Sequence, residues 1–125
     1  MPPLKLKQLQ FEMETIKRLI AFLKEENVYL KNRISEILEN DFDHGMLDTV
    51  DNFQTKSIQE DDLIEQLRKD TLELDKLLIR DSVDGGKLIK QIDFKLKRLN
   101  TNLQTAQKQF VKLKVGLNSF IKENV

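Results

Sequence analysis

The sequence predicts an all-α protein: an up-down-up antiparallel three-helix bundle with coiled-coil-like heptad packing. Residues 89–120 carry an apolar side chain at every alternating step of three and four, which is the spacing of one helix face packed against other helices. Two earlier stretches follow the same spacing less strictly. Only two Pro and four Gly occur in 125 residues, so turns are few and helices are long.

The first helix is predicted from about Leu4 to about Leu38. At about 1.5 Å per residue, it is roughly 50 Å long. Asn27 is the one polar member of its three-four series. The series is Leu9, Met13, Ile16, Ile20, Leu23, Asn27, Leu30, Ile34 and Ile37.

The second helix is predicted from about Met46 to Arg80. It follows residues 39–45, whose Asn, Asp and Gly favour a turn. There Asp43 is expected to cap the helix and Phe42 to pack on the bundle end. Three polar residues interrupt the series, and the sequence leaves open whether the helix is continuous across 54–62. The series is Met46, Val50, Phe53, Ser57, Glu60, Ile64, Leu67, Thr71, Leu74 and Leu78.

The third helix is predicted from about Lys87 to Lys122, because Gly85 and Gly86 end the preceding helical pattern. Gly116 lies within it, at a cost of about 1 kcal/mol relative to Ala. This glycine either permits a close helix contact or has no role. The series is Ile89, Ile92, Leu96, Leu99, Leu103, Ala106, Phe110, Leu113, Leu117 and Phe120.

Both connections are short, so neighbouring helices are antiparallel and residues 1–125 form one domain. This arrangement places Asn27, Ser57, Glu60 and Ala106 in one layer near the middle of the bundle. Such a layer fixes helix register at some cost in stability, with room for a water molecule beside Ala106. The alternative is a small internal site for an ion or polar ligand, although these residues are too few to hold a metal.

Phe11, Phe22 and Tyr29 lie off the seam of the first helix. With Leu19 and Val28 they form an outer apolar strip. The third helix also has off-seam apolar residues: Phe94, Val111 and Val115. These side chains either pack at the edges of a wide core or form an interface with a second copy or a partner helix.

Charge is unevenly distributed. Residues 1–38, 39–86 and 87–125 carry net charges of +2, −9 and +7, which cancel overall. The basic third helix raises the question of nucleic acid, but no recognition motif is present. We expect its cations to pair with the acidic second helix, and therefore expect neither nucleic acid nor a membrane surface as a partner.

Catalytic chemistry is not expected. The chain has no Cys and a single His, which is His44, beside Gly45 in a predicted turn. A nucleophile–base pair or a metal-ligand set cannot be assembled from these residues, so we expect no enzyme activity, metal or cofactor. No apolar run is long enough to span a bilayer and no signal peptide is apparent. A soluble, cytoplasmic protein is expected.

The length and three-helix layout resemble spectrin-type repeats, without Trp or a tandem copy. The stretch from Phe22 to Ile34 resembles the first helices of small bacterial coiled-coil bundle proteins. Neither resemblance assigns a functional residue. The sequence therefore predicts a structural or adaptor protein that acts through helix-mediated protein–protein interaction. The alternatives are a regulatory bundle that binds a small ligand and a nucleic-acid-associated protein that uses the third helix.

Overall fold

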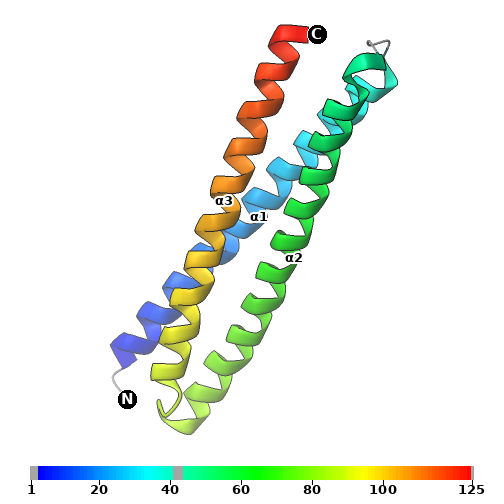
Figure 1. The fold of residues 1–125 in the computed structure, drawn as a ribbon. Coiled ribbons are helices and arrows are strands. Elements are labelled where there is room, and N and C mark those ends of the chain that lie inside the picture. The colour runs from blue at the N-terminus through cyan, green and yellow to red at the C-terminus, as the bar shows by residue number, and fades with distance from the viewer. Residues whose placement is uncertain (1–2, 41–43, 125) are drawn as a thin grey trace.

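The computed structural model describes residues 3–40 and 44–124, which form three long helices (Figure 1). Helix α1 spans Pro3–Glu39, α2 spans Leu47–Asp84 and α3 spans Ile89–Asn124, and the short 3-10 helix η1 covers His44–Met46. No strand occurs in the described parts of the chain. The all-α class is therefore confirmed.

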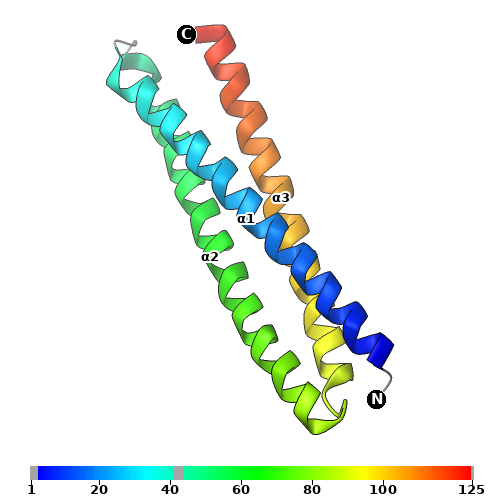
Figure 2. The same ribbon diagram turned by 180° about the vertical axis from the view of Figure 1, so that it is seen from behind.

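The three helices form an up-down-up bundle. Helices α1 and α3 run in the same direction and α2 runs in the opposite one (Figures 1 and 2). Every pair of helices is in contact. The predicted three-helix bundle is confirmed, and its topology leaves α1 and α3 as parallel neighbours that are not consecutive in the chain.

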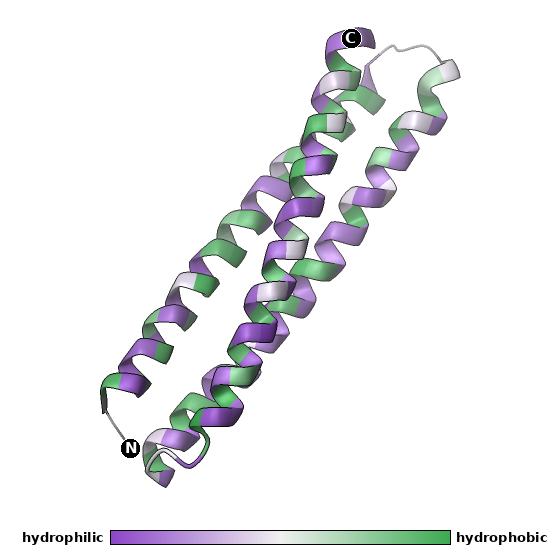
Figure 3. Ribbon diagram, turned by 60° about the vertical axis from the view of Figure 1, so that its left-hand side comes forward, coloured by the Kyte–Doolittle hydropathy of each residue, from purple (hydrophilic) through white to green (hydrophobic). Residues whose placement is uncertain are grey.

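The predicted three-four series lie in a shared core. All nine members on α1 are buried, and those on α2 and α3 are buried except near the helix ends and at Phe53. Hydrophobic and hydrophilic stripes alternate around each helix in Figure 3. The core is long and narrow, because each helix contributes one stripe of side chains.

Helix α2 is continuous across residues 54–62 and ends one turn later than the sequence predicted. It continues past Arg80 to Asp84, where Gly85 adopts a left-handed conformation with φ of 71°. The N–H groups of Gly85 and Gly86 both donate to the carbonyl oxygen of Asp81. These bonds satisfy one of the carbonyl groups that a helix end otherwise leaves unpaired.

The other helix ends differ from the prediction by one or two residues. Helix α2 begins at Leu47 after η1, and α3 begins at Ile89 rather than Lys87. The expected roles of Phe42 and Asp43 lie outside the described residues.

Gly116 permits a close contact between α2 and α3. A Cβ atom built on this glycine would lie 3.3 Å from the ring of Phe53. The Phe53 ring also packs against that of Phe120, with 5.7 Å between ring centroids. The small residue therefore lets an aromatic side chain of α2 lie against the backbone of α3.

Candidate functional site

Asn27 lies in the core of α1 and joins it to α2. Its side chain is fully buried, and its Nδ2 donates to the carbonyl oxygen of Ser57 at 3.0 Å and to Oδ1 of Asp61 at 2.7 Å. The other Asp61 oxygen pairs with Lys31 of α1. Both partners are acceptors, so the Asn27 amide must be oriented with Nδ2 toward them. These two bonds fix the register of α1 against α2.

Glu60 is the second polar group in this part of the core. It is 3% exposed, and its Oε2 is buried without a hydrogen-bond partner among the described residues. Burial, together with the nearby charge of Asp61, raises the pKa of Glu60 to about 7. Burial acts this way because it penalises the charged carboxylate more than the neutral acid. Glu60 is therefore protonated in a large fraction of molecules near neutral pH.

Ser57 and Ala106 are also buried. The Ser57 hydroxyl donates to the carbonyl oxygen of Gln54 at 2.7 Å, within its own helix. Glu60 lines an α2–α3 groove of about 390 Å³ together with Gln109 and Leu113, one turn beyond Ala106. Asn27 and Ser57 make direct contact, whereas Glu60 lies on the side of α2 that faces α3.

This polar layer offers little to a metal or cofactor. No group of three or more His, Cys, Asp or Glu side chains in the described residues could hold a metal ion. Each of the unpaired oxygens, Oδ1 of Asn27 and Oε2 of Glu60, can accept a hydrogen bond from an ordered water. The arrangement can set register and store a titratable proton.

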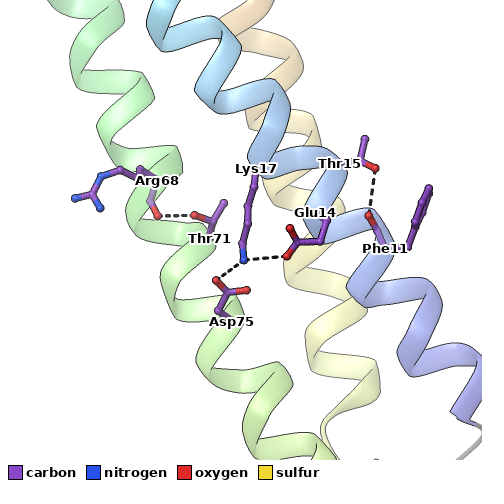
Figure 4. Close-up of polar contacts among 7 residues, drawn as sticks. All are labelled: Phe11, Glu14, Thr15, Lys17, Arg68, Thr71 and Asp75. Atoms are coloured by element: carbon purple, nitrogen blue, oxygen red, sulfur yellow. Dashed lines mark hydrogen bonds and ion pairs between the residues drawn. The ribbon is translucent and has the colours of Figure 1, made fainter.

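The aromatic residues predicted at an interface are exposed on α1. Phe11 is 69% exposed, Phe22 is 60% and Tyr29 is 74%. In Figure 4 the Phe11 ring extends from the side of α1 turned away from α2, while Lys17 on the other side reaches Asp75 of α2 at 2.7 Å. These three residues therefore lie outside the buried core, with more than half of each residue open to solvent.

Two grooves between α1 and α3 border these aromatics. One, of about 520 Å³, is lined by Phe11, Thr15 and Leu19 of α1 and by Lys97 of α3. The other, of about 360 Å³, is lined by residues that include Tyr29 and Asn118.

Heptad spacing places further apolar residues on the same side. Phe22 lies seven residues from both Thr15 and Tyr29, and Val111 lies seven residues before Asn118. Phe94 and Val115 are exposed on the adjoining stripe of α3. We call this surface the α1–α3 face. It comprises Phe11, Leu19, Phe22, Tyr29, Phe94, Val111 and Val115.

The expected pairing between α2 and α3 is not found. Among the described residues, every ion pair between helices includes α1. The acidic Asp70 and Glu73 and the basic Lys95 and Arg98 line one small α2–α3 groove, but they form no ion pair. Three of these pairs use a lysine of α1, and the fourth uses Glu26 of α1 with Lys114 of α3.

Helix α1 reaches its neighbours through four ion pairs. Lys17 pairs with Asp75 and also with Glu14 at 3.3 Å (Figure 4). The hydrogen bond from Lys17 to Asp75 raises the pKa of the lysine. The remaining three pairs are Lys31–Asp61, Lys5–Asp93 and Lys114–Glu26.

Sequence reasoning missed Asp81, which is fully buried where α2 meets α3. Its Oδ1 accepts a hydrogen bond from the Leu88 backbone N–H at 2.8 Å, and its Oδ2 has no partner among the described residues. Asp81 follows Leu78 by three residues, so it continues the buried series of α2. This spacing could have identified Asp81 as a buried helix residue, but its charge favoured its assignment to the turn between the second and third helices.

No helix within the described residues is long and apolar enough to cross a membrane. No protein-family model matches the chain, and no curated protein or solved structure is significantly similar to it. The site must therefore be interpreted from its own chemistry.

Proposed function

We propose that this chain is a non-enzymatic structural or adaptor protein that binds another protein through the α1–α3 face. The observation that carries the proposal is the position of the exposed aromatics. Four aromatic rings are more than half exposed in the described residues, at Phe11, Phe22, Tyr29 and Phe94. All four lie on α1 or α3, and none lies on α2.

Exposed aromatics grouped on one side are typical of protein interfaces. Aromatic residues are enriched in interface cores, and contiguous apolar patches are rare on surfaces that remain in water. Each ring contributes a large apolar area at a low cost in conformational entropy. The two α1–α3 grooves supply the concave surface into which side chains of a partner helix would fit.

The surface of α2 supports a weaker version of the same argument. It exposes Ile58, Leu72 and Ile79 at heptad-related positions, but Glu65 lies on the same stripe between Ile58 and Leu72. The exposed side chains are aliphatic, whereas aromatic residues, including Phe and Tyr, are enriched in interface cores. These residues make a matched control surface for the α1–α3 face.

Other elements of the proposal follow from the same features. The three buried seams fit coiled-coil packing, since their members alternate at steps of three and four. The absence of Cys fits the reducing cytoplasm, where we place the protein. The polar layer then serves to align the helices that display the α1–α3 face.

The proposal is tested by site-specific photo-crosslinking in cells of the source organism. A photoreactive phenylalanine replaces Phe22 on the α1–α3 face or Ile58 on α2, which is 52% exposed. We expect crosslinked protein from position 22 and little from position 58. Equal yields from both positions, or none from either, would contradict the proposal.

A further inference from the structure

Helices α1 and α3 have a fixed relative register, which two ion pairs define at separate levels of the bundle. Lys5 pairs with Asp93 at 3.7 Å, and Glu26 pairs with Lys114 at 3.8 Å. Both pairs join residues that are 88 positions apart. Because the helices are parallel, a residue of α1 lies at the level of the α3 residue numbered 88 higher.

We propose that the partner at the α1–α3 face is a second copy of this chain, an inference that rests on the function proposed above. The two copies are related by a two-fold axis parallel to the bundle. This axis places α1 of one copy on α3 of the other without a shift along the bundle. The offset of 88 residues between α1 and α3 therefore also relates residues at the same level across the interface.

The apolar residues of the two helices match under this offset. Phe22 lies at the level of position 110, next to Val111 of the second copy. Tyr29 lies at the level of position 117, two residues from Val115. The aromatic strip of α1 thus meets the aliphatic residues of α3, and the two-fold axis makes each contact twice.

The charges match as well. Glu12, Glu25 and Glu36 of α1 lie at levels 100, 113 and 124, close to Lys97, Lys108 and Lys122 of the second copy. The offsets are at most five residues, or about 8 Å along a helix, which a lysine side chain can span. A two-fold axis perpendicular to the bundle would instead pack α3 on α3 and oppose lysines to lysines, which disfavours that dimer.

The exposed apolar area of the face approaches the area that a dimer needs. The four rings of the face are 60% to 74% exposed, so they offer about 500 Å² if a buried aromatic covers about 200 Å². A stable interface buries about 800 Å² on each partner. The aliphatic residues of the face supply much of the remainder.

Glu25 and Lys108 provide the sharpest test of this geometry. Both are exposed, and neither forms an ion pair among the described residues. Reversing either charge therefore leaves the contacts within one copy intact. In the proposed dimer, either reversal opposes like charges at two symmetry-related places.

The experiment is sedimentation of the purified chain over a range of concentrations. We expect wild type to form a species of twice 14.7 kDa. Glu25→Lys or Lys108→Glu should each weaken dimerisation about tenfold, since each disturbs two exposed ion pairs. The double variant, which restores opposite charges, should recover most of the affinity. Phe22→Asp should abolish the dimer, and Ile58→Asp should not affect it.

Three outcomes would overturn the inference. A dimer that is insensitive to Phe22→Asp and to both charge reversals would place the interface elsewhere. A monomer at every concentration, combined with crosslinking of position 22 to a different protein in cells, would exclude the second copy and leave the proposed function standing. A monomer without crosslinking at position 22 would contradict both.

Discussion

Replacement of Glu60 by Gln should remove a pH dependence from the stability of the bundle. Glu60 is 3% exposed, and its pKa is raised from 4.5 to about 7 by burial and by Asp61. The folded protein therefore holds a proton that the unfolded chain releases at lower pH. The free energy of unfolding must fall as pH rises through this interval.

The sign and size of this pH dependence follow from the pKa of Glu60 in the folded protein and in the unfolded chain. Below pH 4.5 both states are protonated, so the contribution of Glu60 to stability is fully present. It is lost as pH rises, and the loss is complete above pH 7. Each pKa unit corresponds to about 1.4 kcal/mol, so the shift to about 7 corresponds to at most about 3 kcal/mol.

The assay is denaturant unfolding of wild type and Glu60→Gln, followed by circular dichroism between pH 4 and pH 9. The variant should resemble wild type at pH 4 and be more stable by up to about 3 kcal/mol at pH 9. Glu65→Gln is the control, because the hydrogen bond to Arg68 lowers the pKa of this exposed carboxylate. A difference between wild type and Glu60→Gln that does not vary with pH would refute the reasoning.

Two further substitutions test the polar groups that order the helices. Asn27→Leu should raise the melting temperature by about 5 °C, since a buried polar seam residue specifies register at a cost in stability; a large decrease on a thermal scan would show that its bonds to α2 stabilise the fold. Asp81→Ala should cost about 1–2 kcal/mol in denaturant unfolding, because it removes the acceptor for the Leu88 N–H. Asp81→Asn keeps an acceptor and should recover much of that loss. If the carboxylate charge alone were responsible for the loss, Asp81→Asn would be as unstable as Asp81→Ala.

Apolar spacing was sufficient to predict the number, order and direction of the helices. Each long seam can be buried only against the other two, which leaves few arrangements for short connections. The predicted end of α2 was wrong because a charged residue, Asp81, occupies a buried seam position. Its carboxylate is tolerated there because the Leu88 N–H donates to it, and a contact seven residues away does not appear in a periodic pattern.

The candidate site was predicted only in part. The level of Asn27 followed from counting residues across the first turn, and the structure places its amide on Ser57. The role of Asp61 could not be predicted, because it lies beside the seam and depends on the side-chain directions of two helices. The expected α2–α3 pairing was wrong for a related reason. Net charge by segment indicates which helices attract each other, but not which side chains come within reach.

Hydroxyl-radical footprinting most directly tests whether another protein chain covers the α1–α3 face. Oxidation of Phe11, Phe22 and Tyr29 is measured by mass spectrometry in dilute purified protein, in concentrated protein and in extract of the source cells. Ile58 and Leu72 on α2 serve as internal references. We predict that the three rings lose reactivity on concentration and in extract while the α2 residues keep theirs. Rings that remain as reactive as in the dilute protein under every condition would contradict the central claim.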